Sequence, residues 1–351
     1  MRLCLASLLL LSSSLVACTG SDDSASPGDG GGQCTETSST ISLPLSQFTT
    51  TSGNTQTTQW TLLAPMSTTS VLAYSNDATG APRVAVLDAT GAHDVASIAG
   101  GANYYLRAAR VGECAMLSAK NGLGLACPGQ PYEAAGQDFD TSGSDPLFAL
   151  EAGGEMIAFT QSYAAFTQIT RSGPGQWTRE EQFESSISYP TDALLANGSP
   201  VACFIDAGGH AVVTYGGSRV RSAAKAQWCK LALAGDTLTA VTDIGSVAQP
   251  LASFGADGVL ALAGTLPAMS TPTRLVSLGG APAALATKGG GGVVITALDG
   301  SASKTIPVLG GSTPALDVNG NALTVISTAT DSTSGSMPQY TQTVLFETHC
   351  L

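Results

Sequence analysis

Apolar residues along this chain occur in short runs, most of them rich in Val, Ile, Ala and Leu and bounded by Gly, Asp-Gly or Asn-Gly. Runs of this length between turn residues are typical of β-strands joined by hairpins. No stretch combines a 3.6-residue apolar period with helix-capping residues over the length that a stable helix needs. The pattern therefore predicts an all-β protein.

A unit of two strands recurs along the chain, and five of its copies begin at a proline. Each copy has a short apolar strand, a turn of Gly, Asn or Asp, and a second apolar strand. The copies start at Trp60, Asn103, Pro146, Pro190, Pro250, Pro282 and Pro314. Successive starts are 43, 43, 44, 60, 32 and 32 residues apart. A propeller blade of four strands occupies roughly 40–50 residues, so the first three intervals match one blade each.

We therefore expect residues 34–351 to form a β-propeller of about seven blades, within a range of about six to eight. The interval of 60 would hold an insertion, and the two intervals of 32 would hold three-stranded blades or indicate a lower blade count. A β-sandwich or barrel is the main alternative, because short strands with turns fit those folds too. A β-solenoid fits less well, because its repeats are usually shorter and more uniform.

Closing such a ring requires a partner for the last strand, since an open ring leaves unpaired strand edges. A strand-like stretch at Thr40–Phe48 precedes the first copy, whereas no further strand follows Gln339–Thr348 in the chain. We expect these two stretches to pair as the outer strands of the last blade.

The N-terminus has a separate pattern. Arg2 precedes the apolar run Leu3–Leu11, and three serines lead into Leu15-Val16-Ala17-Cys18. This resembles the lipobox of bacterial lipoprotein precursors. The resemblance covers the first 18 residues and implies that a signal peptide, residues 1–17, is removed and that Cys18 is acylated. A transmembrane helix would need about 20 mainly apolar residues, which this interrupted stretch does not provide.

Residues 18–33 follow as a segment rich in Gly, Ser and Asp without a large apolar side chain, which predicts a flexible tether. Several acyl chains on Cys18 would hold the protein stably to a bilayer. Lipoproteins retained at the inner membrane often have Asp after the lipidated cysteine. This chain has Thr19, which favours the outer membrane of a diderm bacterium, with the periplasmic or cell-surface side left open.

Six cysteines remain after Cys4 leaves with the signal peptide and Cys18 is lipidated. An even number of cysteines in an exported chain indicates disulfides. Ring closure would bring Cys34 to Cys350. A hairpin loop of Ala119-Lys120-Asn121-Gly122 would place Cys114 opposite Cys127, whereas a tighter Asn-Gly turn would shift the register and separate them. Cys203 and Cys229 then pair by elimination, within the long fourth repeat.

Composition narrows the range of partners. The formal charge is −12, from 14 Lys and Arg against 26 Asp and Glu, and becomes −13 when Arg2 leaves with the signal peptide. Nucleic-acid binding needs clustered Lys and Arg, which this chain lacks, so we expect no nucleic-acid partner. Charged residues make up only 11% of the chain, so its surface must be built from neutral polar side chains.

Candidate catalytic residues are sparse. His93 and His210 follow turns and His349 adjoins Cys350, so we interpret none of the three as a catalytic base. Two Ser-x-x-Lys matches, Ser222–Lys225 and Ser301–Lys304, lack the partner motifs of serine penicillin-recognising enzymes. The three tryptophans fit packing between blades better than sugar stacking. Triads can nevertheless assemble from distant residues, so an enzyme is disfavoured and not excluded.

One acidic stretch could bind calcium. Asp138, Asp140 and Ser142 alternate and precede Gly143, as in the first half of a calcium-binding loop. Ala149 stands where such a loop has its bidentate Glu, so a solvated acidic loop is the stronger interpretation and no cofactor is otherwise expected.

The function that fits these features is a membrane-anchored envelope lipoprotein with a non-enzymatic propeller that binds a protein or glycan or acts as a scaffold. Two alternatives remain. One is a polysaccharide-active hydrolase or lyase, which would show carboxylates, or His with Tyr or Arg, converging on one face. The other is a purely structural surface or secretion-complex component, which would show an apolar patch of several hundred Å².

Overall fold

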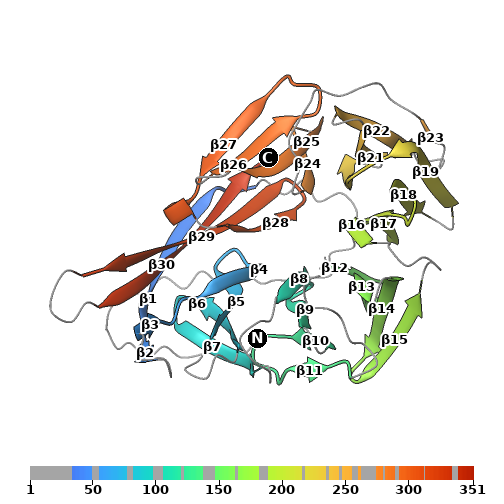
Figure 1. Ribbon diagram of the computed structural model, residues 1–351. Coiled ribbons are helices and arrows are strands. Elements are labelled where there is room, and N and C mark those ends of the chain that lie inside the picture. The colour runs from blue at the N-terminus through green and yellow to red at the C-terminus, as the bar shows by residue number, and fades with distance from the viewer. Residues whose placement is uncertain are drawn as a thin grey trace, which may run out of the picture. The chain divides into compact units, whose positions relative to one another are not determined.

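Seven four-stranded antiparallel sheets surround a central axis in the computed structural model (Figure 1). The structure describes residues 34–49, 55–76, 82–97, 106–119, 122–136, 147–162, 165–181, 189–215, 218–234, 237–244, 247–254, 260–261, 274–279, 281–288, 292–311, 313–333 and 339–351. The protein is thus a β-propeller of seven blades, within the range that the sequence predicts, and each blade contains four strands.

The blades are numbered here in chain order, and the first strand of each lies nearest the axis (Figure 1). Blade 1 contains β4 (Thr61–Ser67), β5 (Ser70–Asn76), β6 (Pro82–Asp88) and β7 (Gly91–Ser97). Blade 2 contains β8 (Arg107–Val111), β9 (Cys114–Ala119), β10 (Gly122–Ala126) and β11 (Glu133–Ala134). Blade 3 contains β12 (Leu147–Ala152), β13 (Glu155–Ser162), β14 (Ala165–Gly173) and β15 (Gln176–Glu181). Blade 4 contains β16 (Tyr189–Ala196), β17 (Ser199–Ile205), β18 (His210–Tyr215) and β19 (Ser218–Lys225).

The second half of the ring continues in the same way. Blade 5 contains β20 (Cys229–Ala234), β21 (Thr237–Ile244), β22 (Val247–Phe254) and β23 (Leu260–Ala261). Blade 6 contains β24 (Arg274–Leu278), β25 (Ala281–Lys288), β26 (Gly292–Ala297) and β27 (Ser303–Pro307). Blade 7 contains β28 (Ala315–Asn319), β29 (Ala322–Ser332), β30 (Tyr340–Cys350) and β1 (Thr37–Leu45). A short hairpin of β2 (Gln47–Thr49) and β3 (Thr55–Thr57) follows β1, and a 3-10 turn, η2 (Leu309–Gly311), precedes β28.

The spacing of the blades corrects the repeat phase expected from the sequence. First strands begin at residues 61, 107, 147, 189, 229, 274 and 315, so the intervals are 46, 40, 42, 40, 45 and 41 residues. Pro250 lies in the third strand of blade 5 and Pro282 in the second strand of blade 6, so these two prolines do not begin blades. The fourth interval contains no insertion, and neither short interval corresponds to a three-stranded blade. A proline can precede an apolar hairpin inside a blade as well as at its start, so Pro250 and Pro282 do not mark blade boundaries.

Ring closure is as expected, with shifted strand limits. β1 pairs antiparallel with β30 from Thr37↔Thr348 to Leu45↔Tyr340, so it becomes the outer strand of blade 7. The closing strand begins three residues earlier than Thr40, and Gln47 and Phe48 belong to β2 instead. The disulfide Cys34–Cys350, with 5.6 Å between the Cα atoms, joins the two strands at the end where β1 begins.

The other two disulfides also join the expected partners. Cys114 and Cys127 flank the β9–β10 hairpin, whose Ala119↔Gly122 register places the two cysteines opposite each other. Cys203 pairs with Cys229, as elimination indicated, but this disulfide links β17 of blade 4 to β20 of blade 5. The expectation that it lies within one repeat is therefore wrong, because residue 229 begins a new blade.

The hydrophobic core lies between blades. Val213 of blade 4 packs with Leu231 and Leu238 of blade 5, and Trp60 of blade 1 packs with Phe346 of blade 7. Both faces of a blade are covered in this way, which explains why strands such as β17 are apolar at successive positions and carry few charges. Within the described residues no helix is long and apolar enough to cross a bilayer.

The closing disulfide leads to a first prediction. A Cys34→Ser/Cys350→Ser variant should lose about 4–5 kcal/mol of unfolding free energy, because the bond closes almost the whole chain into one loop. A Cys114→Ser/Cys127→Ser variant opens a loop with a sequence separation of only 13 and should lose less, about 3 kcal/mol. Urea unfolding of the two double variants measures both values. An equal or smaller loss for the Cys34/Cys350 pair would contradict the role assigned to the closing bond.

Candidate functional site

The first strands of the blades place seven charged residues around the central axis. Their sequences contain four basic and three acidic residues, namely Arg107, Arg110, Lys230, Arg274, Glu151, Asp192 and Asp317. These strands thus hold four of the 14 Lys and Arg of the chain. A channel cavity of about 200 Å³ lies along the axis, and four of these charged residues line it: Arg110, Asp192, Arg274 and Asp317.

Asp317 links three blades across the channel. Its Oδ2 atom accepts a hydrogen bond from Nη1 of Arg110 at 2.9 Å, and its Oδ1 atom lies 3.8 Å from Nη1 of Arg274. Arg110 also donates from Nε to the carbonyl oxygen of Gly112 at 2.9 Å, which fixes its guanidinium. The carboxylate of blade 7 therefore has cationic partners in blades 2 and 6.

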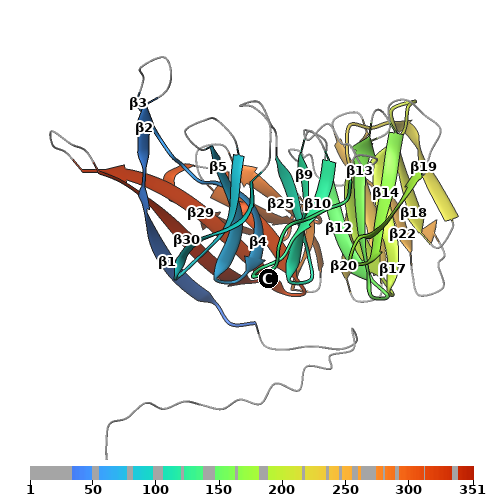
Figure 2. The same ribbon diagram turned by 90° about the horizontal axis from the view of Figure 1, so that it is seen from below.

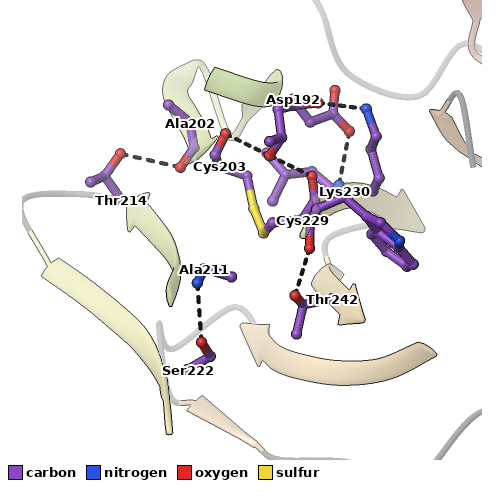
Figure 3. The surroundings of a disulfide bond; sticks show 12 residues. Asp192, Ala202, Cys203, Ala211, Thr214, Ser222, Cys229, Lys230 and Thr242 are labelled. Carbon is purple, nitrogen blue, oxygen red and sulfur yellow. Dashed lines mark hydrogen bonds between the residues drawn. A yellow bond between two sulfur atoms is a disulfide. The ribbon is translucent and has the colours of Figure 1, made fainter. Parts of the chain in front are cut away.

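Asp192 forms a second junction, between blades 4 and 5 (Figure 3). Its side chain is almost fully buried and accepts hydrogen bonds from the backbone N–H groups of Ala193 at 3.0 Å and Leu231 at 2.9 Å. Burial raises the pKa of Asp192, and the cations of Lys230 and Arg274 oppose that rise. Asp192 follows a bulge at Pro190, which turns the side chain towards the neighbouring blade.

Lys230 completes this junction. Its Nζ atom donates to the carbonyl oxygen of Thr191 and lies 5.8 Å from the ring centre of Phe148. Burial lowers the pKa of Lys230, and Asp192 opposes that change. The Thr191 hydroxyl donates to the carbonyl oxygens of Cys203 and Cys229, so the disulfide and the two charged side chains lie at one seam. We interpret the seam as structural, because its polar groups are satisfied by one another.

A larger hollow, the mouth cavity, lies at the end of the channel where β4, β8 and β28 begin, and its volume is about 660 Å³. Its polar lining residues are Gln59, Thr61, Arg107, Thr313, Thr328, Thr330 and Gln342. The apolar lining comes mainly from Trp60, Leu62, Leu63, Leu106, Ala108 and Pro314. The cavity thus combines hydroxyl, amide and guanidinium groups with apolar side chains.

The base of the mouth cavity is held rigidly. The buried side-chain amide of Gln342 accepts a hydrogen bond from the backbone N–H of Trp60 and donates one to the carbonyl oxygen of Trp60, both at 2.8 Å. These two bonds join blade 7 to blade 1 in the same way as the backbone bonds of neighbouring strands. The Trp60 residue is only 7% exposed, and the Arg83 guanidinium lies 5.3 Å from the ring centre. At the rim, Gly310 has a φ of 63° and a Cβ there would lie 2.6 Å from the carbonyl oxygen of Thr328, so only glycine allows the close approach.

Arg107 is the exposed charged group of the mouth cavity. It is the first residue of β8, where its backbone pairs with Ser118 of β9, and its side chain makes no hydrogen bond or ion pair with any residue that the structure describes. Its guanidinium therefore keeps all five N–H donors for solvent or a ligand.

The residues singled out in the sequence do not meet at this site. His93, His210 and His349 lie on β7, β18 and β30, in three different blades. His93 contacts Asp88 and Thr90, and His210 contacts the carbonyl oxygen of Ser222. Ser222 is buried and accepts from the backbone of Ala211, while the Lys304 side chain donates to the carbonyl oxygen of Cys350.

Two predicted sites lie outside the described residues. These are the lipidation site Cys18 and the calcium-loop residues Asp138, Asp140 and Ser142. Within the described ranges no group of three or more His, Cys, Asp or Glu is placed to hold a metal ion.

The tryptophans serve packing, as interpreted from the sequence. Trp60 and Trp228 are buried, and Trp177 joins a polar cluster between blades 2 and 3. In that cluster Glu133 accepts two hydrogen bonds from Arg171, at 2.9 and 2.7 Å, and others from Trp177 Nε1 and the Gly175 backbone. These bonds, led by those from Arg171, lower the pKa of Glu133 to about 2.

Sequence reasoning missed the charged residues of the channel and the mouth cavity. Each stands alone in an apolar strand, so no local motif marks it. Their common feature is that they lie on the first strands of the blades. Using this feature requires knowing where each blade begins in the sequence. Lys230 and Arg274 lie on the first strands of blades 5 and 6, and the repeat in the sequence marks neither of these strands.

No protein-family model and no curated protein matches this sequence. Several solved structures are similar to it. An oligogalacturonate lyase in complex with manganese has 9% identity and a TM-score of 0.47, covering 88% of this chain and 97% of its own. The WD40 domain of SCAP from fission yeast has 10% identity and a TM-score of 0.45, covering 90% of each chain. The fucose-specific lectin from Aleuria aurantia has 15% identity and a TM-score of 0.42, covering 79% of this chain and 97% of its own. These likenesses concern the fold.

The Glu133 cluster generates a prediction of pH dependence. The folded-state pKa of about 2 lies below the ordinary 4.5, so its stabilisation should be complete above pH 4.5 and be lost as the pH falls towards 2. Glu133→Gln should therefore cost on the order of 2–3 kcal/mol at pH 6, and the difference from the unsubstituted protein should shrink at pH 3. Urea unfolding at both pH values measures this, with exposed Glu180→Gln as the control. A difference that does not change with pH would contradict the assignment.

Proposed function

We propose that this protein is an envelope lipoprotein whose propeller is a non-enzymatic binding domain, with the mouth cavity as its ligand site. In this proposal the chain is cut before Cys18, acyl chains on that cysteine hold it at a membrane, and the cavity receives part of a glycan or of a partner protein. The observation on which the proposal depends is a hollow of about 660 Å³ at the channel mouth, lined by the exposed Arg107 together with hydroxyl and amide side chains.

The dimensions and chemistry of the cavity support binding. Its volume lies within the range of about 300–1,000 Å³ that is usual for ligand sites. Gln342 and Trp60 fix the base through paired hydrogen bonds, so little order has to be gained when a ligand enters. The described lining provides hydrogen-bond donors, acceptors and one cation, which are suited to recognition.

The position of the chain's beginning supports an anchored receptor. β1 starts beside Cys350, at the end of β30, and runs antiparallel to β30 (Figure 2). Gln342, which lines the cavity, and Cys350 are eight residues apart on β30, a distance of about 26 Å along the strand. Cys34, which is bonded to Cys350, therefore lies at the end of β30 that is remote from the cavity.

This arrangement would leave the cavity accessible above a membrane. A flexible tether between Cys18 and Cys34 would have an end-to-end distance of about 20–25 Å. A ligand presented by another molecule or surface could then reach the cavity.

The anchor can be tested with two cysteines of the same segment. In a diderm host, Cys18→Ala should abolish incorporation of labelled palmitate and release the protein from the membrane fraction, because the acylated sulfur is removed. Cys4→Ala changes a cysteine that leaves with the signal peptide and should preserve both. Equal labelling of the two variants would overturn the anchor and leave the binding site untouched.

The binding site can be tested by filling it. Thr330 is exposed at the cavity rim on β29, so Thr330→Trp should obstruct the cavity without disturbing the core. The full lipidated chain in nanodiscs would be screened on glycan and peptide arrays, and Thr330→Trp should reduce binding of any hit by at least about tenfold. Ser332→Trp, at the exposed end of the same strand and outside the cavity lining, is the control. Retained binding in Thr330→Trp would place the ligand elsewhere, and cleavage of a bound glycan would favour the hydrolase or lyase alternative.

A further inference from the structure

The inner-strand cations differ in whether their hydrogen-bonding capacity is already used. Arg110 and Arg274 face Asp317, and Lys230 donates to Thr191 beside Asp192. Arg107 makes no such bond with any described residue, although it lies on the same strand as Arg110. Three cations therefore hold blades together, and one points its charge at the mouth cavity.

The lining of the cavity contains no acidic side chain among the residues that the structure describes. The local charge is therefore positive, in a chain whose formal net charge is −12. A guanidinium offers paired N–H donors that match the two oxygens of a carboxylate. The surrounding negative charge opposes a dense polyanion, so a ligand with an isolated carboxylate fits the charge distribution best.

The rest of the lining favours a saccharide as the bearer of that carboxylate. Gln59, Thr61, Thr313 and Thr330 supply amide and hydroxyl groups around the rim, where a sugar ring presents its own hydroxyls. Leu62, Leu63 and Pro314 add apolar surface to the same lining, against which the C–H face of a sugar ring can pack. On the basis of the proposed function, we infer that the mouth cavity binds a glycan containing a uronic acid, and that Arg107 binds the carboxylate of this sugar.

A matched pair of ligands tests this inference. The probes are a glucuronate-containing oligosaccharide and the same oligosaccharide with its carboxylate converted to the methyl ester, measured by calorimetry on the full lipidated chain in nanodiscs. The unsubstituted protein should bind the acid about 10–100-fold more tightly than the ester, as expected for a charge-assisted hydrogen bond. The affinity for the acid should also fall as the salt concentration rises.

Substitutions at Arg107 separate charge from shape. Arg107→Gln should remove the preference for the acid and change the affinity for the ester less than about twofold. Arg107→Lys should restore part of the preference, since it keeps the charge and loses the paired geometry. Lys225→Gln removes one positive charge from an exposed position on β19 and should leave both affinities unchanged.

The outcomes distinguish this inference from the proposed function. Equal affinity for acid and ester, both abolished by Thr330→Trp, would overturn carboxylate recognition and support the cavity as a binding site. Arg107-dependent binding of a peptide C-terminal carboxylate, with no saccharide binding, would overturn the saccharide assignment. If no probe and no array ligand depends on the cavity, the proposed function fails as well.

Discussion

The pairing of β1 with β30 is the interaction on which the other contacts of this protein depend. Each blade buries both faces against its neighbours, so an unclosed ring would expose the apolar faces of two blades together with an unpaired strand edge. Closure uses nine residues on each side, and the Cys34–Cys350 bond fixes its end. Trp60 packs against Phe346 of β30, and Gln342 of the same strand lines the mouth cavity, so the cavity lies where blade 7 meets blade 1.

Charged residues are few in this chain, and those that line the channel link strands of different blades. First strands surround the axis, where charged side chains from several blades meet. Asp317 and Asp192 lie there with cationic or backbone partners, and each links strands that are far apart in sequence. Burial of a charge costs free energy unless it is paired and hydrogen-bonded, so these contacts favour one arrangement of the blades over others.

Much of the architecture could be predicted from the sequence, because it follows from local signals. Strand and turn residues indicated the all-β class, and the need to protect a strand edge indicated the partner of the N-terminal strand. The Cys34–Cys350 pair followed from that closure. The blade phase was harder: Pro250 and Pro282 also precede apolar hairpins, but they lie inside blades, and Cys229 begins a blade without a proline. The charged residues of the site could not be found, because their proximity depends on that phase.

Arg107 at the mouth cavity can be compared with Arg110, which lies three residues later on the same strand. Arg107 and Arg110 share β8, yet Arg110 has a carboxylate across the channel, whereas the described lining of the mouth cavity around Arg107 contains no acidic residue. The Arg107 guanidinium forms no ion pair with a residue that the structure describes, and its positive charge is opposite in sign to the net charge of the chain. A ligand with one carboxylate and many hydroxyls would use that field at short range, while the net negative charge would repel densely charged competitors.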